Sequence, residues 1–355
     1  MDYKTNLKIA IQVISFEMNH AYDRRRVLPF LREFNVENRI EYVPFTEIKS
    51  LDLNQFHFVI VSIRSDLPYI YKILSNSISD LKPKLIFDYC DFIHVINDLG
   101  FYIKSIFAKR RNNYSDTFSK KHFLELLSLF DSIVVGSTIQ KNIIEQFNKK
   151  VTIIQDITEE IPLLEMKKGE LDKGILWEGF ASSNWSIFKK IFKYANNIPN
   201  PSTLYIVTDQ KYYFLAGRYF GFQIQTIFNF FSFFYPKNKY ETRSWSVNNL
   251  VNYANKSKVA MIPISNNKIA QLKPENKVVI MIRLGLLPIV SNIPAYEEFS
   301  KKYDLDICFS NLIEFKRIYS DLESHFSKLE LARPTILDDY SYDNIKSKWE
   351  KIFEI

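Results

Sequence analysis

A short polar segment in the last third of the chain carries residues suited to binding an anion. Lys273, Asn276 and Lys277 stand at the start of a predicted helix, with Glu275 among them. Amide N–H groups at a helix N-terminus and nearby ammonium groups both attract phosphate. The pattern predicts a phosphate or diphosphate site, where Glu275 would accept hydrogen bonds from ligand hydroxyls. A solvated helix start with ordinary surface lysines is the alternative.

The elements around this segment form a strand–loop–helix–strand pattern. We expect a strand over 258–264, a helix that opens near Pro274, and a second strand over 287–291. Gly285 follows the last apolar turn of the helix, which suits a left-handed C-cap. Such a unit directs its loop amides and lysines toward the carboxyl edge of a sheet.

A second polar turn follows a predicted strand over 174–178. Its hydroxyl and amide groups can cap the next helix and also contact a phosphate. The residues concerned are Gly179, Ser182, Ser183 and Asn184. Capping alone is the alternative for this turn.

Candidate acid–base groups lie in the first half of the chain. Asp88 and Asp91 end a predicted strand, and His94 lies one turn beyond. A carboxylate there could take a proton from a hydroxyl, and two nearby carboxylates can raise one pKa. Glu17 follows the first strand and is the second candidate base. A helix cap with a polar loop is the alternative for the aspartate pair.

Composition limits the class of protein. The 355 residues suggest two domains, and 46% hydrophobic with 25% charged residues indicates a globular chain. The two cysteines, Cys90 and Cys308, lie far apart and have no metal-binding spacing, so neither a disulfide framework nor a zinc site is indicated. We expect no metal and no cofactor. The net charge of +7 and basic clusters such as 24–26 fit an anionic partner or simple compositional bias. No nucleic-acid-binding motif accompanies the charge, so we expect no nucleic-acid partner.

The rest of the chain alternates between strand-like and helical patterns, which predicts parallel sheets covered on both faces. An aperiodic, charged stretch over 156–174 predicts a linker. Expected strands in the first half are 7–15, 56–62, 84–88, 132–136 and 151–155, with helices over 22–34, 119–130 and 138–147. After the linker we expect strands over 174–178 and 203–208, and helices over 185–194 and 341–355.

This layout resembles the GT-B fold glycosyltransferases, especially the bacterial enzymes that build surface polysaccharides. The resemblance rests on the layout of the whole chain and on the segments DSIVVGS (131–137), ILWEG (175–179), KPENK (273–277) and LGLLPIVSNIPAYEEF (284–299).

The resemblance implies an α/β protein of two Rossmann-like parallel-sheet domains that face a cleft. Residues 1–160 would bind the acceptor, and the helix over 342–355 would cross back to them. Residues 174–341 would bind the nucleotide-sugar donor through Gly179, Ser182, Ser183, Asn184, Lys273, Glu275, Asn276 and Lys277. Asn19, His20 and His94 would bind the acceptor, and Asp88, Asp91 or Glu17 would act as the base.

The implied activity is metal-independent sugar transfer to a growing surface glycan or lipid-linked acceptor. The retaining branch of the family carries two glutamates that here correspond to Leu272 and Ile280. The stereochemistry therefore stays open. A nucleotide-sugar epimerase of the same fold and a non-catalytic, two-lobed sugar-binding protein are the alternatives.

An aromatic segment over 212–240 suggests where the protein could meet a membrane. Aromatic side chains favour the headgroup boundary, and Lys237 and Lys239 follow the motif FFYP. The start of the chain reads as a strand and no stretch is apolar enough to span a bilayer. We expect a cytoplasmic protein, peripheral on the inner face of the cell membrane. Ordinary packing of these aromatics in the second domain is the alternative.

Overall fold

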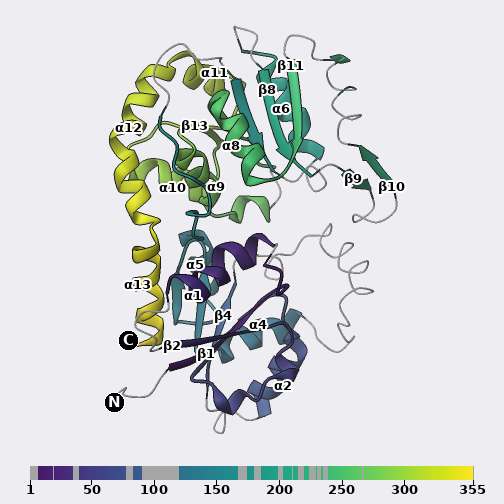
Figure 1. Cartoon of the computed structure of the whole chain (residues 1–355), viewed down its shortest axis with the longest axis vertical. Helices are drawn as coiled ribbons and strands as arrows, with labels where there is room; N and C mark the ends of the chain where they lie inside the picture. Colours follow the sequence, from purple (N-terminus) through teal and green to yellow (C-terminus); the bar gives the residue numbers. More distant parts are fainter. Residues whose placement is uncertain are drawn as a thin grey trace. The chain divides into compact units, whose positions relative to one another are not determined.

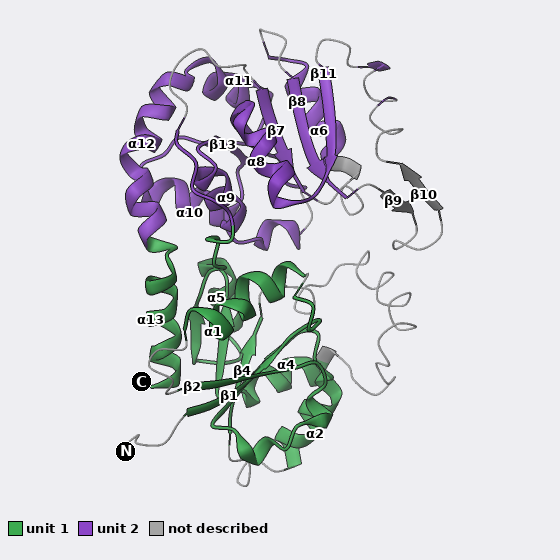
Figure 2. Cartoon of the chain, in the orientation of Figure 1, with its two compact units in different colours: residues 1–160, 339–355 green, residues 161–338 purple. Residues whose placement is uncertain are grey.

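The chain folds into two compact units, which are described separately below. Unit 1 comprises Met1–Glu160 and Asp339–Ile355, and unit 2 comprises Ile161–Asp338 (Figures 1 and 2). The computed structural model describes residues 7–18, 20–34, 40–76, 83–89, 120–166, 174–179, 185–198, 203–209, 211–214, 220–223, 229, 233–234, 239–265 and 268–354.

Unit 1 is built on a six-stranded parallel sheet with the strand order β2-β1-β3-β4-β5-β6. Every residue of β3 is buried, as expected where helices cover both faces of a parallel sheet. The strands are β1 (Leu7–Gln12), β2 (Ile40–Phe45), β3 (Phe58–Ser62), β4 (Lys84–Asp88), β5 (Ser132–Val135) and β6 (Val151–Ile153).

The helices of unit 1 lie between these strands in the chain, except for α13, which comes from the C-terminal end of the chain. They are the π-helix η1 (Asp23–Val27), α1 (Leu28–Arg32), α2 (Leu67–Asn76), α4 (Lys120–Leu129), α5 (Thr138–Ile144) and α13 (Tyr342–Phe353), with single 3-10 turns at Ile48–Ser50 and Leu53–Gln55.

The C-terminal helix α13 packs on unit 1, although the chain reaches it only after passing through unit 2 (Figure 2). The Trp349 ring lies 4.9 Å from the Phe30 ring, and the Phe353 ring lies 5.1 Å from that of Phe58. The helix therefore completes the core on this face of the first sheet. This confirms the prediction that the final helix crosses back to the N-terminal domain.

Unit 2 contains a second six-stranded parallel sheet, with the strand order β11-β8-β7-β12-β13-β14. A separate antiparallel hairpin is formed by β9 (Lys211–Phe214) and β10 (Phe220–Gln223). The sheet strands are β7 (Gly174–Glu178), β8 (Thr203–Thr208), β11 (Lys239–Ser244), β12 (Ser257–Ile262), β13 (Leu287–Ser291) and β14 (Cys308–Phe309).

Helices follow β7, β11, β12 and β13 of this second sheet, and others come after β14. They are α6 (Trp185–Ala195), α8 (Val247–Asn255), α9 (Asn276–Arg283), α10 (Pro294–Lys302), α11 (Leu312–Ser320) and α12 (Leu322–Asp339), with a 3-10 turn at Ala270–Leu272.

The predicted glycine caps the C-terminus of helix α9, whose last residue is Arg283. Gly285 has a φ of 71°, its N–H donates to the Ile282 carbonyl, and the Leu286 N–H donates to the Met281 carbonyl. These two bonds form a Schellman motif, which uses the left-handed conformation that glycine tolerates. A Cβ at this position would also lie 2.2 Å from the Glu165 carbonyl oxygen. The turn thus directs the chain from α9 straight into β13.

The packing of α13 leads to a stability prediction. We expect Trp349→Ala to lower the free energy of unfolding by about 3–5 kcal/mol, the range for removing a buried aromatic side chain. The hydrogen-exchange rates of the β1 and β3 amides should increase as the stability falls. Lys351→Ala, on the exposed face of the same helix, is the control and should change stability by less than about 0.5 kcal/mol. Equal effects of the two substitutions would contradict the packing role.

Candidate functional site

The second sheet reverses its strand order between β7 and β12. From β7 the chain adds β8 and then β11 on one side, and it returns to add β12 on the other side. Open α/β sheets bind ligands at such a switch point, beyond the carboxyl ends of the strands. The residues that follow β7 and β12 are therefore the first candidates for a site.

Lys277 reaches this switch point from the first turn of α9. Its Nζ donates to the Glu178 carbonyl oxygen at 2.8 Å and lies 3.0 Å from the Glu178 carboxylate. Glu178 is the last residue of β7, so the contact joins the ends of the two elements that flank the switch point. One of the predicted donor-binding lysines, Lys277, thus lies at the switch point.

Trp245 fixes the other oxygen of the Glu178 carboxylate. Its indole Nε1 donates to Glu178 Oε1 at 3.0 Å, and its backbone N–H donates to the Thr208 carbonyl at the end of β8. The carboxylate therefore bridges Trp245 and Lys277. Neither Glu178 nor Trp245 was among the residues predicted for the site, because nothing in their local spacing distinguishes them from an ordinary strand end and helix start.

Gly179 lies beside the lysine ammonium. A Cβ added there would lie 3.3 Å from Lys277 Nζ and 2.9 Å from Cζ2 of Trp177. A side chain at this position would therefore crowd the ammonium and collide with the tryptophan. Because residue 179 is glycine, it contributes only backbone atoms beside the ammonium, which suits a turn that a ligand approaches closely.

Lys190 is a second cation at the carboxyl end of the sheet. Its Nζ donates to the Ile264 carbonyl, just beyond β12, at 2.9 Å. Desolvation by burial lowers the pKa of this lysine. Sequence periodicity placed Lys190 on an ordinary amphipathic helix, and only the fold brings it to the loop after β12.

The predicted residues around Lys277 differ in their exposure. Lys273 is exposed, whereas Glu275 and Asn276 are buried. Glu275 and Glu178 lie near enough to the buried Tyr296 hydroxyl to add to the rise in pKa that desolvation causes there. Lys273, which precedes α9, is thus the exposed lysine, Lys277 in the first turn is half-buried, and the acidic and amide groups of Glu275 and Asn276 lie inside.

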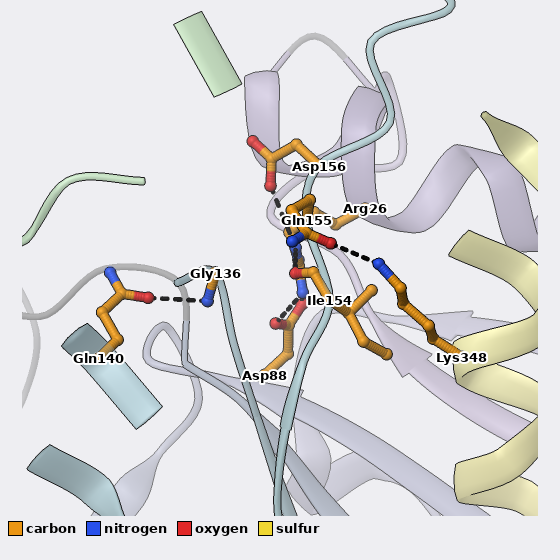
Figure 3. Close-up of polar contacts among 8 residues, drawn as sticks. All are labelled: Arg26, Asp88, Gly136, Gln140, Ile154, Gln155, Asp156 and Lys348. Atoms are coloured by element: carbon orange, nitrogen blue, oxygen red, sulfur yellow. Dashed lines mark hydrogen bonds and ion pairs between the residues drawn. The ribbon is translucent and has the colours of Figure 1, made fainter. Parts of the chain in front are cut away.

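At the carboxyl edge of the first sheet, Arg26 occupies the centre of a buried polar cluster (Figure 3). Its guanidinium donates to both Asp88 oxygens at 2.6 and 2.7 Å and to Asp156 Oδ1 at 3.1 Å. It also donates to the Ile154 carbonyl. Burial raises the pKa of the Asp88 carboxyl, and the Arg26 charge opposes that rise. Asp88 therefore lies in a structural ion pair at the end of β4.

Arg26 belongs to the basic triplet Arg24–Arg26, and the other two arginines also pair with a carboxylate. Arg24 Nε and Arg25 Nε lie 2.9 and 2.7 Å from the two oxygens of Glu160. Farther along the same edge, Lys348 of α13 donates to Gln155, and Gln140 accepts from the Gly136 N–H (Figure 3). The triplet, which the sequence presents as a candidate basic surface, instead fastens the segment after β6.

The switch point of the first sheet lies between β1 and β3, and its polar groups pair internally. Gln12 Oε1 accepts from the Ser62 N–H, the Ser62 hydroxyl and the Ser65 hydroxyl. Beyond β1, Glu17 and His20 are both exposed. These two residues lie where the predicted acceptor-binding loop follows the first strand.

Several predicted residues lie outside the described part of the chain, and their roles stay predictions. They are Asn19, Asp91, His94, Ser182, Ser183 and Asn184.

Two further observations concern the described residues as a whole. No group of three or more His, Cys, Asp or Glu side chains is placed to hold a metal ion within them. Their helices also lack the combination of length and apolar character that crossing a bilayer requires.

Comparison with known proteins yields structural likeness only. No family model matches the sequence, and no curated protein matches it. Among solved structures, apo OtsA aligns with a TM-score of 0.61 at 8% identity, covering 98% of both chains. An α-glucosyltransferase in complex with UDP aligns with a TM-score of 0.58 at 13% identity, covering 98% of this chain and 100% of that chain.

A third similar structure is a point mutant of S. aureus TarM in complex with fondaparinux, α-GlcNAc-glycerol and UDP. The TM-score is 0.55 at 10% identity, with 84% of this chain and 55% of TarM covered. The chain thus spans about half the length of TarM. At these identities the likeness establishes the fold. The protein has the two-domain α/β fold of the GT-B glycosyltransferases. The predicted fold class, α/β with two parallel-sheet domains, is confirmed.

The buried cluster in unit 1 leads to a prediction about Asp88. Asp88→Asn removes one charge of a buried pair and leaves Arg26 undercompensated, so we expect a loss of about 3–5 kcal/mol in unfolding free energy. Asp66→Asn is the matched control, because Asp66 pairs with Lys49 at the surface, where such pairs contribute about 0–1 kcal/mol. Denaturant unfolding measures both. A loss from Asp88→Asn no larger than that of the control would contradict the structural role.

Proposed function

We propose that the protein is a glycosyltransferase that moves a sugar from a nucleotide-sugar donor to a growing glycan or a lipid-linked acceptor. The observation that carries the proposal is the position of Lys277 at the switch point of the second sheet, in a chain with the GT-B fold. Breaking the bond between the sugar and a nucleoside diphosphate leaves negative charge on the departing phosphate. Fixed cations and N–H dipoles at that point stabilise the transition state.

The donor site would be assembled from two turns of unit 2. Lys277 and the exposed Lys273 would meet the diphosphate, and Gly179 would allow the ligand close to the backbone. The lysines would supply the positive charge without a metal ion. Complexes of the α-glucosyltransferase and of TarM contain UDP, which supports a uridine nucleotide as the first donor to test.

The acceptor would bind unit 1, where the general base is also expected. Glu17 is exposed beyond β1, whereas Asp88 is buried against Arg26. We therefore favour Glu17 over Asp88 as the base, and Asp91, outside the described residues, stays the other candidate. Arg24, Arg25 and Arg26 are paired with carboxylates, so this basic cluster does not by itself indicate a nucleic-acid acceptor.

A peripheral position on the inner face of the cell membrane is part of the proposal. Phe233 and Phe234 are 81% and 58% exposed, and their rings pack edge to face at 5.5 Å. Lys239 is exposed at the start of β11, a few residues farther along the chain. Exposed aromatic rings with a nearby lysine are suited to the boundary of anionic headgroups, where lipid-linked acceptors lie.

The donor site is tested by calorimetry with UDP and UDP-sugars. We expect Lys277→Ala to weaken binding by about 1–3 kcal/mol, the range for a hydrogen bond to a charged group. Lys301→Ala is the control, since Lys301 is exposed on α10 and pairs with Glu297 in the same unit. Release of UDP from a UDP-sugar, measured with and without EDTA, tests transfer and its independence of metal.

Two results would contradict this proposal. One is unchanged affinity in a correctly folded Lys277→Ala variant. The other is the absence of UDP release with every lipid-linked or glycan acceptor while duplex DNA supports it, which would place the acceptor in a different class.

The membrane position is tested by sedimentation with vesicles that contain anionic lipid. We expect the Phe233→Ser/Phe234→Ser variant to lose most of the bound fraction, and binding of the wild type to fall with salt. Ile313→Ser is the matched control, because Ile313 is also 81% exposed but lies on α11. A wild type that does not bind the vesicles, or equal loss in both variants, would contradict the prediction.

A further inference from the structure

Glu178 is the carboxylate that shares the switch point with Lys277. Its side chain is 12% exposed, and it is contacted by Lys277 Nζ on one oxygen and by Trp245 Nε1 on the other, each at 3.0 Å. A carboxylate beside a predicted phosphate site repels the phosphate. The presence of Glu178 at this position therefore needs an explanation other than attraction of the anion.

We propose that Glu178 is a positioning residue for the donor site. Its carboxylate, fixed by Trp245, holds the Lys277 ammonium at the place where the donor diphosphate binds. This inference rests on the proposed function and adds to it a residue that touches the cation rather than the substrate.

The contacts that Lys277 makes support this role. An ammonium group has three donors. One donates to the Glu178 carbonyl oxygen, and the ammonium also forms an ion pair with the Glu178 carboxylate at 3.0 Å. Both contacts are to one residue at a strand end, so they restrict where the ammonium can lie. A flexible lysine that is ordered before the ligand arrives loses less conformational entropy on binding.

The neighbouring residue leaves the ammonium uncovered. A side chain at position 179 would lie 3.3 Å from Lys277 Nζ, but the residue is glycine. Trp245 is anchored through its own N–H to the Thr208 carbonyl at the end of β8. A chain of contacts therefore leads from the end of β8 to Lys277: β8 anchors Trp245, Trp245 holds the Glu178 carboxylate, and Glu178 holds the ammonium.

A second role for the carboxylate makes the opposite prediction. If Glu178 merely neutralised Lys277, its removal would raise the net positive charge and tighten the binding of an anion. If Glu178 positions Lys277, its removal lets the lysine move and weakens binding. The two roles thus differ in the sign of one measurement.

The experiment is a double-mutant cycle on the full chain. Calorimetry measures UDP and inorganic pyrophosphate binding to the wild type, Glu178→Gln, Lys277→Ala and the double variant. We expect Glu178→Gln to weaken binding about tenfold, and to change it less than about twofold when Lys277 is already alanine. Trp245→Phe should weaken binding in the same direction, and it serves as a second variant if Glu178→Gln fails to fold.

Glu323→Gln is the control for losing the carboxylate of a lysine pair, because Glu323 pairs with Lys258 in the same unit and is 80% exposed. It should leave binding unchanged. Tighter binding by Glu178→Gln, or equal weakening with and without Lys277, would overturn the positioning role and leave the donor site standing. If the wild type binds neither UDP nor pyrophosphate, both the donor site and the positioning role are wrong.

Discussion

The Lys277 ammonium contacts both the carbonyl oxygen and the carboxylate of Glu178, at the switch point of unit 2 where we place the donor site. Parallel strands bring their carboxyl ends to one edge, and a change in strand order sends the following helices to opposite sides of the sheet. In this sheet α6 follows β7 and α9 follows β12. The Lys277–Glu178 pair connects the end of β7 with the start of α9.

Unit 1 contains a comparable pair of charges with a different consequence. Arg26 and Asp88 are both buried, and the guanidinium donates to both carboxylate oxygens. Such a pair fixes the end of β4 and the segment after β6, but its charges are satisfied within the protein. The Lys277 side chain is instead 33% exposed. Lys277 is therefore accessible to a ligand at the switch point, whereas Arg26 is not.

Much of the fold follows from local sequence, whereas the side-chain partners do not. Apolar runs bounded by turn residues predicted β4, β7, β8 and β13 with the bounds observed. The strand β2 was missed because it contains Pro44, which an edge strand tolerates. Arg26 and Asp88 are 62 residues apart, and Lys277 and Glu178 are 99 apart, so no local spacing could pair them. The sequence therefore located Lys277 at a helix start, but it did not reveal Glu178 and Trp245 beside it or Lys190 at the loop after β12.

The most direct test of the central claim is a crystal structure of the protein with UDP or a UDP-sugar bound. The account predicts a diphosphate oxygen within hydrogen-bond distance of Lys277 Nζ, beyond the carboxyl ends of β7 and β12, with the Glu178 carboxylate still contacting the ammonium. A nucleotide bound elsewhere, with Lys277 contacting only residue 178, would contradict it.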